Sequence, residues 1–144
     1  MSYSIKHLFH ISASKTEVFN AINGINGLSQ WWTSQTSGGE NLGDTIQFNF
    51  GDMTGPTMKI VALEKDNTLT WECVESPHGW VGNKITFALD ENDGKTRVRF
   101  THEGFPEQDD FYSICSFSWG RYMESLRQLC QTGKGEGFGT EHYR

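Results

Sequence analysis

The fold is decided by residues 109–133, DDFYSICSFSWGRYMESLRQLCQTG, which predict one long amphipathic helix. Asp109 is a favourable N-cap residue, and Gly133 stands where a helix commonly ends. Gly120, in the middle, costs about 1 kcal/mol relative to Ala and favours a close approach of the helix backbone to another element. Apolar residues recur mostly three or four apart and form one broad face: Phe111, Ile114, Cys115, Trp119, Tyr122, Met123, Leu126, Leu129 and Cys130. Such a face needs an apolar surface to cover it.

Strands with one apolar face are predicted to supply that surface. Apolar and polar residues alternate in stretches along the chain, which is typical of strands with one covered face and one wet face. The alternating stretches are residues 5–11, 46–50, 58–62, 69–73, 85–89 and 98–102. All but the first follow one another without a helical pattern between them, so an antiparallel meander is expected. Residues 33–44 are polar and contain several glycines, and we expect a loop there.

Two short helices are predicted between the first strand and the second. Ser14 followed three residues later by Glu17 is a capping box, and the helix that it begins should end at Gly24. Residues 28–32 are predicted to form a second short helix. Together these elements predict an α+β, helix-grip fold, in which a curved antiparallel sheet of about six strands wraps around the long C-terminal helix. We expect one domain over residues 1–133 and a glycine-rich, mobile tail over residues 134–144.

Composition and charge limit the kinds of partner. The chain has 144 residues, which suits one domain, and its net charge is −6 at pH 7. Because clustered Lys and Arg are needed to bind phosphate backbones or anionic membranes, neither nucleic acid nor a membrane is an expected partner. No signal peptide is recognisable, and no stretch approaches the roughly 20 apolar residues of a membrane span.

The cysteines favour a reducing cytoplasm. There are three, Cys73, Cys115 and Cys130, without paired spacing. Cys115 and Cys130 would lie about 22 Å apart on the predicted helix, which is too far for a disulfide. Free thiols are therefore expected.

Three local patterns indicate a family. They are ISAS before EVF at residues 11–19, QWWT at residues 30–33, and THEGF at residues 101–105, before a final helix that contains Trp119. With the order of elements, they resemble the START-like, birch-pollen-allergen-like superfamily. Within it, the chain resembles the activator of heat-shock protein ATPase family, in a small stand-alone form related to the C-terminal domain of the eukaryotic co-chaperone. The resemblance implies either a small hydrophobic or amphipathic molecule held between sheet and helix, or a stress-response role beside a heat-shock chaperone.

A ligand pocket is predicted between the sheet and the long helix. Phe, Trp and Tyr make up 13% of the chain, and large flat side chains line cavities as readily as they fill cores. The predicted ligand-binding residues are Trp32, Trp71, Phe87, Phe100, His102, Trp119, Tyr122 and Met123. By alternation His102 faces inward, where it is either a polar anchor for a ligand or a histidine satisfied by its neighbours. His7 has the same two interpretations.

Two further aromatic features remain open at this stage. Adjacent residues in a helix diverge by roughly 100°, so only one of Trp31 and Trp32 should point into the core, and the other should reach the pocket mouth or the surface. The sequence leaves open which of the two does so. Trp80 lies in the loop at residues 77–82, which is either a flap over the pocket or a turn whose tryptophan packs on the rim of the sheet.

Three functions are compatible with these features. The first is binding of a small hydrophobic or amphipathic molecule, the second is modulation of a heat-shock chaperone ATPase, and the third is a cyclase or dehydratase that uses a pocket histidine as acid or base. No catalytic, metal-binding or cofactor-binding motif is visible, so neither a metal nor a cofactor is expected. The chain is expected to be a monomer or a homodimer.

Overall fold

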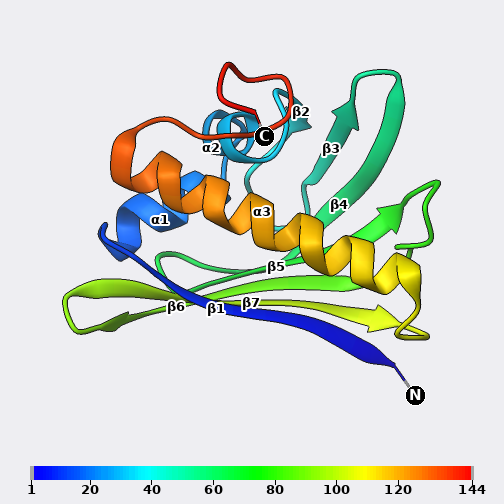
Figure 1. Cartoon of the computed structure of the whole chain (residues 1–144), viewed down its shortest axis with the longest axis horizontal. Helices are drawn as coiled ribbons and strands as arrows, with labels where there is room; N and C mark the ends of the chain where they lie inside the picture. The colour runs from blue at the N-terminus through cyan, green and yellow to red at the C-terminus, as the bar shows by residue number, and fades with distance from the viewer. Residues whose placement is uncertain (1, 144) are drawn as a thin grey trace.

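The computed structural model describes residues 2–143 as one sheet, two short helices and one long helix (Figure 1). The elements in chain order are β1 (Tyr3–Ile11), α1 (Lys15–Ile22), α2 (Ile25–Trp31), β2 (Gln35–Gly38), β3 (Thr45–Phe50), β4 (Met53–Glu64), β5 (Thr68–Glu75), β6 (Lys84–Asn92), β7 (Lys95–Phe105) and α3 (Asp110–Thr132). The strand order is β1-β7-β6-β5-β4-β3-β2, and every neighbouring pair is antiparallel. Figure 1 shows α3 lying across this curved sheet, with α1 and α2 beside its C-terminal half. The predicted α+β helix-grip fold is confirmed.

The sheet has seven strands rather than about six, because β2 lies in the segment that was predicted to be a loop. Its sequence, QTSG, has no apolar alternation, and three of its four residues are exposed. It is a strand because Gln35–Gly38 pair with residues 46–49 of β3 at the edge of the sheet. Pairing of backbone groups leaves no periodic signal in polar side chains, so hydrophobic periodicity could not reveal it.

The ends of the helices follow the predicted caps. The side chain of Asp109 accepts a hydrogen bond from the Tyr112 backbone N–H at 3.0 Å, and Gly133 ends α3 in a left-handed conformation. Ser14 caps α1 by accepting a hydrogen bond from the Glu17 backbone N–H at 3.1 Å. These contacts satisfy backbone groups that a helix end leaves without partners.

Trp31 and Trp32 are both buried, so the prediction that only one of them could point into the core is wrong, whereas Trp32 also lines the cavity described below, as predicted for the second tryptophan. The two rings are nearly parallel, at 12°, with centroids 6.0 Å apart. Trp31 donates a hydrogen bond from Nε1 to the Ala21 carbonyl oxygen at 2.8 Å. Both are buried because apolar elements lie on both sides of α2: Trp31 packs on Phe87 of β6, with centroids 6.2 Å apart, and Trp32 packs on Phe48 of β3, at 4.2 Å.

The C-terminal segment, residues 134–143, lies beside α2. Backbone N–H groups of Gly137 and Phe138 donate to the carbonyl oxygens of Gln30 and Trp32, at 3.0 and 2.8 Å. A Cβ atom at Gly135 would lie 2.2 Å from the Gln30 oxygen, so glycine is needed for this approach. The sequence shows these glycines but does not show that they let the segment approach the backbone of α2. The mobility of the segment stays a prediction.

Two helical glycines provide a test of the packing. The structure shows no close approach at Gly120, where a Cβ would meet His7 Cε1 at 3.8 Å, an ordinary van der Waals distance. At Gly27 in α2, by contrast, a Cβ would lie 2.3 Å from the Ala21 oxygen. The two positions should therefore respond in opposite directions to the same substitution.

Gly27→Ala should lower the free energy of unfolding by about 1–3 kcal/mol, because the added methyl group overpacks the contact between α1 and α2. Gly120→Ala is the matched control and should raise it by up to about 1 kcal/mol, because alanine favours the helix. Urea denaturation measures both. Effects of the same sign would contradict this description of the packing.

Candidate functional site

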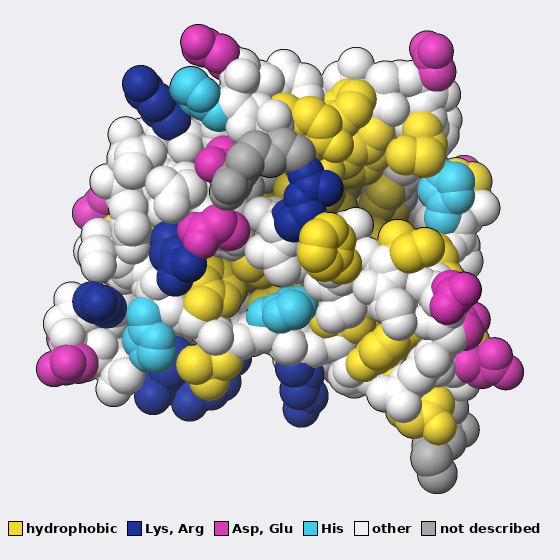
Figure 2. All heavy atoms as spheres, in the orientation of Figure 1, with side chains coloured by type: hydrophobic (Ala, Val, Ile, Leu, Met, Phe, Trp, Pro, Cys, Tyr) yellow, Lys and Arg dark blue, Asp and Glu magenta, His cyan; other side chains and the backbone are white. Residues whose placement is uncertain are grey.

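An apolar cavity of about 320 Å³ opens between the first half of α3, the β3–β4 hairpin and the loop after β5. Figure 2 shows hydrophobic side chains gathered around a hollow at its upper right, between α3 and this hairpin. The cavity is lined by Trp32, Phe50, Met53, Gly55, Pro56, Ser76, His78, Trp80, Phe111, Ile114, Cys115, Ser118, Trp119 and Tyr122. Its size and apolar lining are those of sites for small molecules.

Aromatic rings form the inner wall of the cavity. The ring centroid of Trp32 lies 4.9 Å from that of Trp119 and 6.4 Å from that of Tyr122. Trp80 packs on Trp119, with centroids 5.9 Å apart and planes 17° from parallel, and it meets His102 edge-on. The tryptophan of the loop at residues 77–82 thus packs on the core and also lines the cavity, and a role of this loop as a flap stays a prediction.

The mouth of the cavity is also apolar. The side chains of Met53 and Ile114 line it and are 51% and 64% exposed, and Phe111 beside them is also exposed. Single exposed apolar residues are ordinary on protein surfaces, but a group of them around a hollow marks a place of interaction.

Only three of the eight predicted ligand-binding residues line this cavity: Trp32, Trp119 and Tyr122. Trp71, Phe87 and Phe100 do not line it. The ring of Phe87 packs edge-on against that of Trp71, with centroids 5.2 Å apart, and against that of Phe100, at 5.3 Å. Met123 is buried and lines a separate hollow of about 150 Å³ beside His7. The rings of Trp71, Phe87 and Phe100 are therefore part of the packed core, and the apolar cavity lies nearer the N-terminal end of α3.

His102, the remaining predicted residue, is fully buried, and both its ring nitrogens have partners. Trp119 donates from Nε1 to Nδ1 of His102 at 3.0 Å, so Nδ1 carries a lone pair and Nε2 carries the proton. The side-chain amide of Asn83 lies 3.0 Å from Nε2 and accepts that proton when its oxygen faces the ring. Burial lowers the pKa of His102 to about 3, so the ring is neutral and structural. Of its two interpretations, the structure shows the satisfied histidine.

His7 likewise lies outside the cavity. Its Nε2 atom lies 3.3 Å from the carbonyl oxygen of Ser116. Neither histidine singled out by the sequence therefore reaches the apolar cavity.

Burial favours the neutral forms of one thiol and one phenol in the wall of the cavity. Burial raises the pKa of the Cys115 thiol, against a smaller lowering by the N–H of Trp80. Burial, assisted by Tyr143, raises the pKa of Tyr122 to about 12. His78, on the exposed loop, adds an imidazole at the mouth. Within residues 2–143, no group of His, Cys, Asp and Glu side chains could hold a metal ion.

Sequence reasoning missed most of the outer wall of the cavity. The residues missed are Phe50, Met53, Pro56, Phe111, Ile114 and Cys115. Phe50 ends one alternating strand and Ile114 lies on the apolar face of α3, so both were assigned to the core. The sequence shows that a residue such as Ile114 belongs to the apolar face of α3. It does not show whether another element or an empty space lies opposite that residue.

The fold and this cavity define a START-like protein of the helix-grip class. Residues 12–131 match the family described as "Activator of Hsp90 ATPase homolog 1-like protein", and the chain belongs to that family. The comparison with curated proteins gives no match. Across residues 2–143, no helix is both long and apolar enough to cross a membrane.

Solved structures share the fold. The chain is similar to the Aha1 dimer from Colwellia psychrerythraea, with 34% identity and a TM-score of 0.85 over 92% of this chain and 99% of that one. It is also similar to protein MLL2253 from Mesorhizobium loti, with 21% identity and a TM-score of 0.76 over 88% and 96% of the two chains. CalU16 from Micromonospora echinospora, with 18% identity and a TM-score of 0.76 over 97% and 71%, shares the fold alone.

His102 should make the protein less stable as the pH falls. Its pKa is about 3 in the folded protein, below the ordinary value of 6.5, so between these values the unfolded chain binds a proton that the folded protein does not. The free energy of unfolding should therefore fall by up to about 1.4 kcal/mol per pH unit below pH 6.5. His102→Gln, which still accepts from Trp119 but does not titrate, should give a shallower slope in urea denaturation at a series of pH values. Parallel slopes would contradict this assignment.

Proposed function

We propose that the protein binds a small molecule with a largely apolar body in the cavity between α3 and the β3–β4 hairpin. The observation that carries the proposal is the cavity itself, about 320 Å³ of space walled by aromatic and aliphatic side chains. Moving an apolar ligand into such a site is favourable by about 25 cal/mol for each Å² of its apolar surface that leaves water. The volume corresponds to about ten water molecules, which suits a chain or ring system of about ten carbon atoms.

The arrangement favours binding over catalysis. The two histidines that a cyclase or dehydratase was expected to use lie outside the cavity, and His102 is neutral, with both nitrogens bonded within the core. The thiol and phenol in the wall are held protonated by burial. Modulation of a heat-shock chaperone ATPase, which the family description suggests, stays a prediction.

We also propose that the protein forms a homodimer through the outer strip of α3 around Phe117, beside the mouth of the cavity. Phe117 is 71% exposed, which is unusual on a helix that covers a core on its other side. The similar protein from Colwellia psychrerythraea is described as a dimer. A second copy would remove the Phe117 side chain from water.

Binding of 1-decanol, followed by isothermal titration calorimetry, tests the cavity. The wild-type protein should bind one molecule saturably, and Ile114→Trp should weaken binding at least about fivefold, because a larger ring at the mouth occupies the space. Leu8→Trp is the control: it makes a similar change at an exposed residue of β1 outside the cavity lining and should leave the affinity unchanged. The proposal fails if the wild type binds no decanol, or if both substitutions act alike.

Sedimentation velocity tests the dimer. The wild type should sediment as a dimer, and Phe117→Ser should shift it toward the monomer, because it removes an apolar side chain from the outer strip. Leu42→Ser changes an equally prominent exposed residue of the β2–β3 loop and should have no effect. A wild-type protein that sediments as a monomer at every concentration would contradict the proposal.

A further inference from the structure

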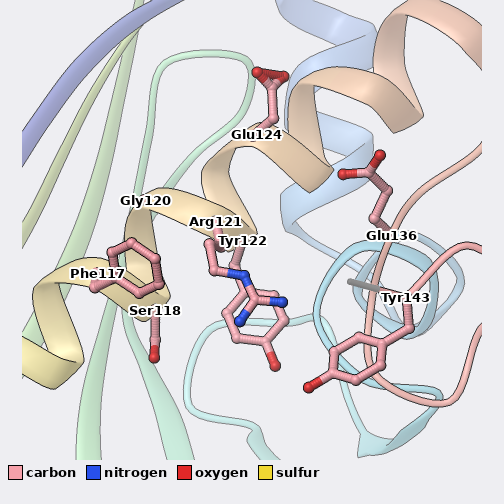
Figure 3. A pocket seen from close by; sticks show the side chains of 8 residues that line it. All are labelled: Phe117, Ser118, Gly120, Arg121, Tyr122, Glu124, Glu136 and Tyr143. Atoms are coloured by element: carbon pink, nitrogen blue, oxygen red, sulfur yellow. The ribbon is translucent and has the colours of Figure 1, made fainter.

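A second hollow adjoins the apolar cavity along α3. It has a volume of about 390 Å³, and we call it the polar groove. Figure 3 shows its lining, which comes from two turns of α3 and from the C-terminal segment. Ser118 and Tyr122 line both the polar groove and the apolar cavity, so the two hollows share a boundary. A ligand body in the apolar cavity and a head group in the polar groove would therefore contact the same two side chains.

The polar groove holds a cation and hydroxyl groups at the end near this boundary. Arg121 is exposed, and it forms no ion pair with any carboxylate of residues 2–143. Its positive charge acts on the neighbouring phenol of Tyr122, which is also hydrogen-bonded to Tyr143. In Figure 3 the hydroxyl groups of Tyr122 and Tyr143 point toward one another, with the Arg121 guanidinium nearby.

The groove is also lined by two carboxylates, those of Glu124 and Glu136. In Figure 3 both carboxylates lie above the Arg121 guanidinium and the Tyr143 ring. Glu124 is held by Arg127, through a pair of hydrogen bonds, and by Gln128. The groove therefore offers a guanidinium and two hydroxyl groups, and both of its glutamates interact with other groups.

We propose that the ligand is an amphiphile with an anionic head, whose apolar body fills the cavity and whose head binds Arg121 and the hydroxyl group of Tyr143. This inference rests on the proposed function, and it adds the class of ligand. Guanidinium and phenol groups donate hydrogen bonds to carboxylate oxygens, and the charged donor gives the stronger bond. Because Tyr122 stays protonated, it adds no competing negative charge.

The absence of charged side chains from the lining of the apolar cavity also favours a head group outside it. The apolar cavity has no lysine, arginine, aspartate or glutamate among the residues that line it. A charged head inside it would lose its hydration without a partner, which is strongly unfavourable. In the polar groove the head keeps contact with water and gains a cation.

Two probes with the same chain length separate the head from the body. Decanoate and 1-decanol, titrated at about pH 8 and low ionic strength, differ in charge but carry matching apolar chains. Arg121→Gln should weaken decanoate binding about threefold to fivefold, as expected for an exposed ion pair, and should leave decanol binding unchanged. Tyr143→Phe should weaken decanoate binding about twofold to threefold, because it removes one hydrogen-bond donor to the carboxylate. Lys59→Gln, which removes an equal charge from an exposed position of β4, should change neither affinity.

The outcomes separate this inference from the proposed function. If decanol and decanoate both bind and Arg121→Gln affects neither, the apolar site stands and the anionic head is refuted. If Lys59→Gln weakens decanoate as much as Arg121→Gln does, the effect belongs to net charge and the inference is again refuted. If neither probe binds the wild type, the proposed function itself fails.

Discussion

The fit of one indole ring, that of Trp119, holds α3 in place on the sheet. The ring centroid lies 4.7 Å from that of Phe100 on β7 and 4.9 Å from that of Trp32, just after α2. At the same time its N–H must reach Nδ1 of the buried His102. A large ring that has to pack on several elements and satisfy one directional bond tolerates few positions of the helix. The packing of Trp119 and its hydrogen bond to His102 therefore restrict the distance and the angle between α3 and the sheet.

A helix fixed in this way leaves different amounts of space at its two ends. On the C-terminal side of Trp119, the side chains of Met123 and Leu126 are buried, and Met123 lines a hollow of about 150 Å³. On the N-terminal side, Phe111 and Ile114 are exposed, and Figure 1 shows the β3–β4 hairpin curling away from the rest of the sheet. The same contact therefore leaves less space at one end of α3 than at the other, so a packed core and a cavity coexist in a small domain.

Much of the architecture was predictable because it depends on local patterns: alternation in the strands, Ser14 and Asp109 as caps, and Gly133 at the end of the helix. Edge strand β2 was not predictable, because backbone pairing alone defines it. Of the candidate site, the aromatic inner wall at Trp32, Trp119 and Tyr122 was predictable. The sequence could not separate rings that pack solidly, such as Phe87, from rings that border empty space, because that depends on how far the hairpin stands from α3. Nor could the sequence show that the two ring nitrogens of His102 are hydrogen-bonded to Asn83 and Trp119.

The packing of the indoles has an optical consequence. All five tryptophans form one connected chain: the centroids of Trp31 and Trp32 and those of Trp32 and Trp71 are 6.0 Å apart, and Trp119 joins Trp32 to Trp80 at 4.9 and 5.9 Å. Rings this close share electronic excitation before they emit, so light absorbed by one is redistributed among all of them. The near-ultraviolet spectrum is then a property of the whole array, and a disturbance at any one ring is visible in the emission of the entire set.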